Sequence, residues 1–213
     1  MESTKILLIR HGETEYNKIG RLQGAIDIPL NETGKLQAKI LAGALKNFPA
    51  DIFISSPLKR ALMTVKICAE FQGKDNIRIE PRFSEINHGV WSGQFISDIG
   101  KNYPDDFKIW QTLPHKFKMP GGESLNDVSI RANSALVEII KENPGKTVLI
   151  GAHGTINSVM LCNFAGLSLE NVLKFPQDNA CINLLEIEND DRKILLKNFV
   201  DYQTTREIKT ETT

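Results

Sequence analysis

The chain has 213 residues, of which 41% are hydrophobic and 24% are charged, as is ordinary for a globular protein with a sizeable core. Its 26 basic and 26 acidic residues give a formal net charge of +0, so no charge footprint indicates nucleic-acid or membrane-surface binding. No apolar run is long enough for a membrane span, and the first strand begins so early that we expect no secretory signal. We therefore expect one cytoplasmic domain over residues 1–213.

The cysteines agree with that location. Cys68, Cys162 and Cys181 are odd in number, widely spaced and set among apolar residues. A metal or redox site is the functional alternative, but this arrangement is more typical of buried, reduced thiols in a cytosolic protein.

The first eighty residues alternate between apolar strands and amphipathic helices. The expected elements are a buried strand over 5–9, a helix over 31–48, a strand over 51–55, a helix over 58–71 and a short strand over 77–80. Alternation of strands and helices predicts a parallel sheet covered by helices.

Two of these helices carry more detailed predictions. The helix over 31–48 has apolar residues near helical spacing, and we expect it to bury Leu36, Ile40, Leu41, Ala44 and Leu45. The helix over 58–71 is expected to be capped by Ser56 and to have Pro57 in its first turn, since both residue types favour helix starts.

The segment over residues 86–123 differs from the rest in its many glycines and prolines, and it holds both tryptophans, Trp91 and Trp110. We expect an inserted cap of short helices over one edge of the sheet. The tryptophans are expected to pack over a pocket there or against a partner, and a homodimer is left open.

The remainder of the chain predicts a second set of elements. In order these are a helix over 124–142, a strand over 147–151, a helix over 156–165, and two strands over 181–187 and 193–199. Residues 189–191, Asn-Asp-Asp, predict a hairpin between the last two strands. The polar residues 202–213 are expected to be a frayed tail.

Reactive side chains follow several of the predicted strands. The first strand ends in Arg10, His11 and Gly12, and the strand over 147–151 leads into His153 and Gly154. The strand over 51–55 leads to a helix whose first turn carries Arg60, and the strand over 77–80 leads to Glu85. Because the carboxyl ends of parallel strands share one side of a sheet, we expect these groups to converge on one crevice.

This combination suits phosphoryl transfer. Two arginines can bind phosphate oxygens, and one neutral imidazole can attack phosphorus while a second donates to the equatorial oxygens. A carboxylic acid can protonate the departing oxygen if it holds a proton. Each residue alone is more simply explained as structural, but four strand ends with matching chemistry favour a site. Nothing in this chemistry calls for a metal or another cofactor.

The same residues resemble the motifs of the histidine phosphatase superfamily, the phosphoglycerate mutase-like enzymes. The matching segments are residues 8–14 (LIRHGET) with Asn17, 21–24 (RLQG), 55–61 (SSPLKRA), 85–93 (EINHGVWSG), 120–124 (PGGES) and 152–154 (AHG). They occur in the family's order and cover nearly the whole chain. The resemblance implies a three-layer α/β/α sandwich with a mostly parallel sheet, and we expect one antiparallel strand near the C-terminus.

The resemblance also implies roles for individual residues. His11 would be the nucleophile that forms a phosphohistidine, and Glu85 the proton donor and later the base for water. The expected phosphate pocket consists of Arg10, Asn17, Arg60, His153 and Gly154. Gln23 and Gly24 match a loop on the substrate side. The sequence departs from the family pattern at His88, where phenylalanine is commoner, so substrate preference is open there.

Three functions remain from the sequence. The first is a phosphomonoesterase for small phosphorylated metabolites, similar to the broad-specificity and α-ribazole phosphatases. The second is a phosphoglycerate mutase, although mutases of the family usually have a longer insertion; the basic residues from His115 to Lys118 would then bind a second anion. The third, a phospho-ligand binding module without activity, has no support because every expected catalytic residue is present.

Overall fold

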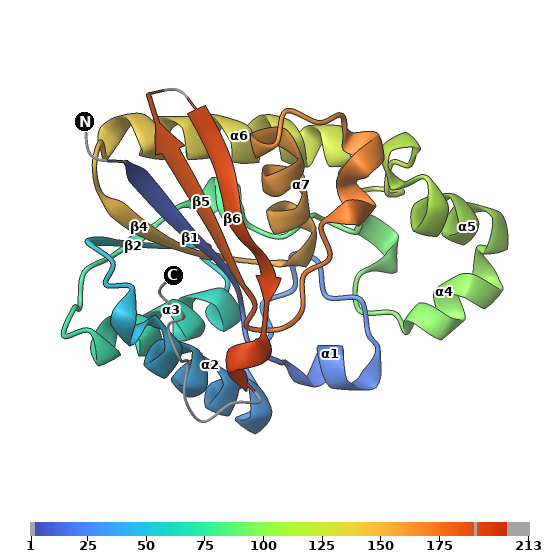
Figure 1. Cartoon of the computed structure of the whole chain (residues 1–213). Helices are drawn as coiled ribbons and strands as arrows, with labels where there is room; N and C mark the ends of the chain where they lie inside the picture. The colour runs from blue at the N-terminus through green and yellow to red at the C-terminus, as the bar shows by residue number, and fades with distance from the viewer. Residues whose placement is uncertain (1–2, 190, 204–213) are drawn as a thin grey trace.

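The computed structural model describes residues 3–189 and 191–203, and its centre is a six-stranded sheet with the order β3-β2-β4-β1-β5-β6 (Figure 1). The strands are β1 (Thr4–Arg10), β2 (Ile52–Ser55), β3 (Ile77–Ile79), β4 (Thr147–Ala152), β5 (Ile182–Glu188) and β6 (Asp191–Phe199). Strands β1 to β4 are parallel, and β5 pairs antiparallel with both β1 and β6. The predicted mostly parallel sheet with one antiparallel strand is confirmed.

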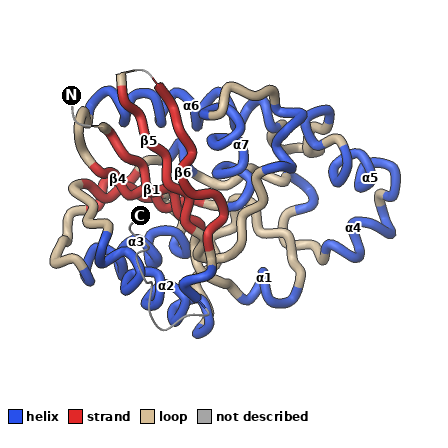
Figure 2. Tube along the Cα trace, viewed as in Figure 1, coloured by secondary structure: helices blue, strands red, loops and turns tan. Residues whose placement is uncertain are grey.

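Helices cover both faces of the sheet and make three layers (Figures 1 and 2). One face is covered by α6 (Leu125–Glu142) and α7 (Gly154–Phe164), and the other by α2 (Glu32–Ala44) and α3 (Lys59–Phe71). Side chains of β1 alternate between the layers: Ile6 and Leu8 join the α6/α7 core, and Leu7 and Ile9 join the α2/α3 core. A strand buried on both faces has to be apolar throughout, as the sequence of β1 is.

The predicted buried stripe of α2 is partly wrong. Leu36 and Ile40 are 58% and 38% exposed. The buried face consists instead of Gly34, Ala38, Leu41 and Ala42, followed by Leu45 in the short helix η1 (Leu45–Asn47). A Cβ on Gly34 would lie 2.0 Å from the carbonyl oxygen of Glu13, so small residues let α2 pack tightly against the loop after β1.

The predicted start of α3 is also wrong. Leu58 is the N-cap residue and Lys59 the first helical residue. The Ser56 hydroxyl lies 2.7 Å from Nε2 of His153, a contact between two loops that no helix pattern can reveal. Arg60 does lie in the first turn. The start of α7 is at Gly154, two residues before the predicted one.

The cap over residues 86–123 contains η3 (Gly89–Trp91), α4 (Ile96–Asn102), α5 (Pro104–Thr112) and η4 (Pro114–Lys116). It lies to the right of the sheet in Figure 1, beyond the carboxyl ends of the parallel strands. Trp91 is fully buried and stacks on Phe117 with 5.1 Å between ring centroids, so the cap has an apolar core of its own.

The remaining elements are α1 (Glu15–Ile19), η2 (Pro81–Phe83), η5 (Leu169–Lys174) and η6 (Asp201–Gln203). The expectation of fraying is wrong for η6, because Tyr202 is 2% exposed and its hydroxyl donates to the carbonyl of Ala180. Residues 204–213 lie outside the described residues. The three cysteines are buried and unpaired, as predicted. None of the described helices is long and apolar enough to cross a membrane.

Candidate active site

A cavity of about 630 Å³ lies between the carboxyl ends of the strands and the cap. Eight of the predicted site residues line it, namely Arg10, His11, Asn17, Gln23, Gly24, Arg60, Glu85 and Gly154. His153 is fully buried beside the cavity wall, with its ring centroid 5.2 Å from that of His11. The predicted residues therefore come together at one place.

His11 has one ring nitrogen fixed and the other directed toward a cation. Its Nδ1 lies 2.6 Å from the carbonyl oxygen of Gly12, and its Nε2 is 3.2 Å from Nε of Arg60. Burial, followed by the charges of Arg10 and Arg60, holds the pKa of His11 well below its usual range. The ring is thus neutral, with its proton on Nδ1 and a lone pair on Nε2.

Gly12 is required by the packing around that histidine. A Cβ at this position would lie 2.4 Å from the carbonyl oxygen of Gly34 in α2. Only glycine therefore lets the chain pass so close to α2 while its carbonyl holds Nδ1 of His11.

Arg60 is fully buried, and all of its nitrogens are engaged. Nη1 donates to the carbonyl of Ile26 and Nη2 to that of Gly24, each at 2.7 Å. Nε is 3.2 Å from Nε2 of His11 and equally far from Nδ1 of His153. Burial lowers the pKa of Arg60 to about 10, which still leaves the guanidinium charged at neutral pH.

Arg10, the last residue of β1, has an unsatisfied donor. Its Nη1 donates to the carbonyl of Gln177, but its buried Nε has no partner among the described residues. Burial lowers the pKa of Arg10. A buried N–H group without an acceptor costs stability, so an oxygen of a bound anion would complete this site.

Glu85 lines the cavity, and its carboxyl group contacts the first turn of α7. Its Oε1 accepts from the backbone N–H groups of Ile86 (2.9 Å) and Ile156 (3.2 Å), and its Oε2 from that of Thr155 (3.1 Å). A Cβ on Gly154 would be 3.6 Å from Nε of Arg10 and 3.8 Å from Oε2 of Glu85. The carboxyl group of Glu85 and the guanidinium of Arg10 thus both lie close to Gly154.

Two of the amides that line the cavity, Asn17 and Gln23, are fixed through Thr14. Oδ1 of Asn17 lies 3.2 Å from the Thr14 nitrogen in the capping box of α1, and Oε1 of Gln23 accepts from the Thr14 hydroxyl at 2.9 Å. With both oxygens engaged, the NH₂ groups are the donors that these amides can offer to a ligand.

Several residues of the site escaped the sequence analysis. Ser56 lies against His153, and Gln177 holds Arg10. Arg21 lines the cavity with its guanidinium carbon 4.6 Å from the ring centroid of Phe95. No local pattern points to Gln177, whereas Ser56 and Arg21 belong to the motifs over 55–61 and 21–24 and could have been considered.

The basic residues of the cap do not form the second anion site that the mutase alternative requires. Of residues 115–118 only Phe117 lines the cavity, as does Trp110 nearby. Nε2 of His115 is 4.0 Å from Glu170, and Nζ of Lys118 is 3.6 Å from Asp127.

His88 lines the cavity as a neutral ring. It is 5% exposed, and it contacts Trp110 edge to face with 6.3 Å between ring centroids. Burial lowers the pKa of His88 to about 4, against smaller opposing effects of Glu85 and Glu123.

Replacement of His88 by phenylalanine is expected to make folding less sensitive to acid. Between pH 6.5 and 4 the unfolded chain binds a proton at this histidine and the folded chain does not. The free energy of unfolding therefore falls as the pH falls, by about 1.4 kcal/mol per unit. Urea unfolding at pH 7, 5.5 and 4.5 measures this slope, which should be shallower in the variant. His115→Phe is the control, and equal slopes for wild type and His88→Phe would contradict the prediction.

Among the described residues, no group of three His, Cys, Asp or Glu side chains is placed to hold a metal ion. The arrangement instead offers a buried neutral imidazole, two guanidinium groups and one carboxyl group around a cavity. It can bind a tetrahedral anion, attack it and exchange a proton with a leaving oxygen.

Comparisons with known proteins agree with this chemistry. The sequence profile of the histidine phosphatase superfamily (branch 1) matches residues 6–200. Phosphoserine phosphatase 1 of Hydrogenobacter thermophilus is 39% identical over 193 residues, which are 91% of this chain and 90% of that protein. A metal-independent phosphoserine phosphatase of Arabidopsis thaliana is 29% identical over 94% of this chain and 82% of its own length.

The fold agrees as well. A structure of a phosphoserine phosphatase from Entamoeba histolytica with phosphoserine superimposes with a TM-score of 0.80 and 28% identity. The match covers 92% of this chain and 96% of the other. The protein described here thus belongs to the histidine phosphatase superfamily.

Proposed function

We propose that this protein hydrolyses small phosphomonoesters through a phosphohistidine at His11, and that phosphoserine is one of its substrates. The observation that carries this proposal is the state of His11: a buried, neutral ring whose unprotonated Nε2 accepts from Nε of Arg60 at 3.2 Å. A nucleophile beside a fixed cation is the arrangement that attack on a phosphate requires.

The first step begins when the phosphate group replaces one contact within the site. In the structure, the N–H of Arg60 Nε points at the lone pair of His11 Nε2. A phosphate oxygen takes over this N–H, and another oxygen accepts from the free Nε of Arg10. The lone pair of His11 is then released to attack phosphorus.

Glu85 completes both halves of the reaction. In the first, the P–N bond to His11 forms, the bond from phosphorus to the ester oxygen breaks, and Glu85 gives its proton to that oxygen. In the second, Glu85 takes a proton from water, the water oxygen bonds to phosphorus, and the P–N bond breaks. His11 returns to its neutral form, and phosphate leaves. The ring of His153 packs beside Arg60, with Nδ1 3.2 Å from Nε of Arg60 and Nε2 in contact with Ser56, and so helps to hold the guanidinium in place.

The choice of phosphoserine rests on the named relatives and on Arg21. Its guanidinium lies between the rings of Phe95 and Tyr16, 4.6 and 5.3 Å from their centroids. Its Nε is buried without a partner, and within the described residues no carboxylate pairs with it. A cation in the cavity without a counter-ion suits a substrate that carries a carboxylate in addition to its phosphate.

Phosphoserine and phosphoethanolamine, which share a primary alcohol leaving group, are the substrates that test this proposal. With EDTA present, kcat/KM is expected to be higher for phosphoserine by roughly 10- to 100-fold, the value of one charged hydrogen bond. Arg21→Met keeps the contact with the rings and is expected to remove this preference without affecting phosphoethanolamine. Failure to hydrolyse either compound would contradict phosphatase activity. Equal rates on both would contradict the role of Arg21.

The mutase alternative is tested with 3-phosphoglycerate and 2,3-bisphosphoglycerate, where isomerisation in place of hydrolysis would support it. The cavity gives it no second cluster of cations among the described residues, because Phe117 is the member of residues 115–118 that lines the cavity. His115 and Lys118 lie near Glu170 and Asp127 instead. A homodimer and a cytoplasmic location stay predictions from the sequence.

A further inference from the structure

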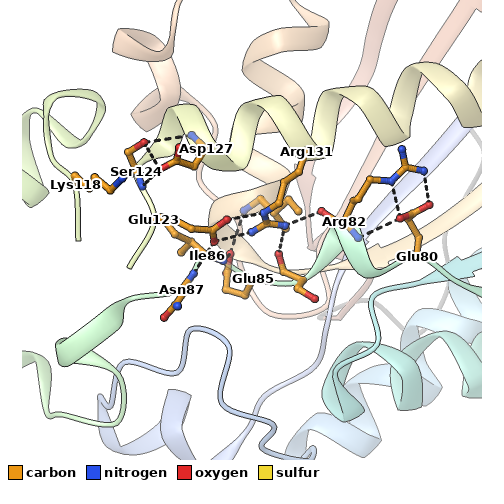
Figure 3. A network of polar contacts seen from close by, with 12 residues as sticks. Glu80, Arg82, Glu85, Ile86, Asn87, Lys118, Glu123, Ser124, Asp127 and Arg131 are labelled. Carbon is orange, nitrogen blue, oxygen red and sulfur yellow. Dashed lines mark hydrogen bonds and ion pairs between the residues drawn. The ribbon is translucent and has the colours of Figure 1, made fainter. Parts of the chain in front are cut away.

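A partly buried ion pair connects α6 to the segment that carries Glu85 (Figure 3). Nε and Nη2 of Arg131 donate to the two carboxylate oxygens of Glu123 at 2.8 and 3.0 Å. Nη1 of the same guanidinium donates to the carbonyls of Arg82 and Ser84 at 2.6 and 2.7 Å. The side chains of Arg131 and Glu123 are only 21% and 26% exposed.

Glu123 also binds the backbone of Asn87, two residues after Glu85. Its Oε2 accepts from the backbone N–H of Asn87, and its own N–H donates to the carbonyl of Asn87, both at 2.9 Å. Ser84 and Asn87 flank Glu85 and Ile86 in the chain. The ion pair therefore fixes the backbone directly before and shortly after the proposed proton donor, and it joins the two ends of the cap.

The segment needs such support because it lies outside any regular element. Residues 84–88 follow η2 and precede η3, so no ladder of backbone hydrogen bonds holds them. The carboxyl group of Glu85 itself rests on three N–H groups, one from Ile86 and two from α7. A small displacement of the backbone would move the carboxyl group away from the leaving oxygen, and displacements of this size cost large factors in rate.

We propose that the Arg131–Glu123 pair is a positioning device for proton transfer by Glu85. The inference rests on the proposed function, since it assumes that Glu85 protonates the leaving oxygen. Arg131 is not among the described residues that line the cavity, so it acts through Glu85 and not on the substrate.

The test is the dependence of rate on the leaving group. Arg131→Lys keeps the charge but cannot reproduce the planar fork that reaches Glu123 and two carbonyls at once. In single-turnover measurements of leaving-group release, we expect the rate for phosphoserine to fall about 10- to 100-fold. The rate for p-nitrophenyl phosphate should fall less than about threefold, since p-nitrophenolate leaves without protonation. Inhibition by inorganic phosphate is expected to be unchanged.

Arg82→Lys is the matched control. The side chain of Arg82 binds both oxygens of Glu80 at 2.8 Å and Glu138 at 2.6 Å. Arg82 is close to Glu85 in sequence, but among the described residues its side chain forms no hydrogen bond or ion pair with residues 84–87. It should leave the ratio of the two rates unchanged. If Arg131→Lys does not fold, Glu123→Gln tests the same pair, because it preserves the shape and removes the charge.

Glu85→Gln measured on the same two substrates separates the possible failures. If it slows phosphoserine selectively and the Arg131 and Glu123 variants slow both substrates equally, the positioning role is overturned while the proposed function stands. If Glu85→Gln itself slows both equally, the proton-donor role fails, and the inference fails with it. Selective losses in all three variants support the inference.

Discussion

Replacement of His11 by alanine is expected to abolish turnover, with a loss of at least about 10⁴-fold in kcat, as when a nucleophile is removed from other covalent catalysts. Within the described part of the chain, no second imidazole presents an unprotonated nitrogen to the part of the cavity lined by Arg10 and Arg60. His88 belongs to the cap side, and His153 lies beside the wall with both nitrogens engaged. Steady-state assays with phosphoserine measure the loss.

Binding of phosphate should survive this substitution. The guanidinium groups of Arg10 and Arg60 remain, and Arg60 Nε loses one of its two partners and becomes a better donor to an anion. Titration with inorganic phosphate or vanadate is therefore expected to give an affinity close to that of wild type. His115→Ala removes an imidazole from the cap and is the control. Turnover retained by His11→Ala would exclude His11 as the nucleophile.

The second large effect is expected for Glu85→Gln. Glutamine preserves the shape of the side chain and can still accept from the N–H groups of Thr155 and Ile156, but it cannot transfer a proton. For alkyl phosphates such as phosphoserine we expect kcat to fall about 10²- to 10⁴-fold, the usual contribution of general acid catalysis. For p-nitrophenyl phosphate the first step should be nearly unaffected.

Single-turnover measurements separate the two steps of this reaction. Release of p-nitrophenol reports the first step, and release of phosphate reports the second, in which Glu85 is proposed to act as base. We expect Glu85→Gln to retain a burst of p-nitrophenol followed by slow phosphate release. The same loss on every leaving group, without a burst, would argue that Glu85 only supports the fold.

The sequence predicted those parts of the protein that local chemistry determines. Strands β1 and β4 are apolar because both of their faces are buried, so they were visible as runs of leucine, isoleucine and valine. Their ends bring His11 and His153 to one side because parallel strands place their carboxyl ends together. Convergence of the site followed from these two facts and from the positions of Arg60 and Glu85 after the other strands.

Contacts between distant segments could not be predicted. Ser56 and His153 are 97 residues apart, and Arg10 and Gln177 are 167 apart. Ser56 was predicted to cap a helix because a cap can be recognised from neighbouring residues in the sequence. Its observed partner, His153, is brought close only by the fold. The Arg131–Glu123 pair was missed for a related reason: its spacing of eight residues spans a helix start, and its importance comes from the carbonyls of Arg82 and Ser84.

Apolar periodicity misled where close packing favours small residues. Leu36 and Ile40 lie near the period expected of a buried stripe, yet α2 buries Gly34, Ala38 and Ala42. The loop through Gly12 and Glu13 passes so near that larger side chains do not fit. At the other end of the chain, Tyr202 is surrounded by polar residues in sequence but packs in the core beneath α2.

The central claim is that the phosphoryl group passes through His11, and the most direct test is to trap it there. Protein mixed with labelled phosphoserine and quenched within milliseconds in base preserves a phosphorus–nitrogen bond that acid would break. Peptide mass spectrometry should then find the phosphoryl group on the peptide that contains His11, and Glu85→Gln should accumulate more of it from p-nitrophenyl phosphate. A phosphoryl group found on another residue, or hydrolysis at full rate with no phosphoenzyme in either protein, would contradict the claim.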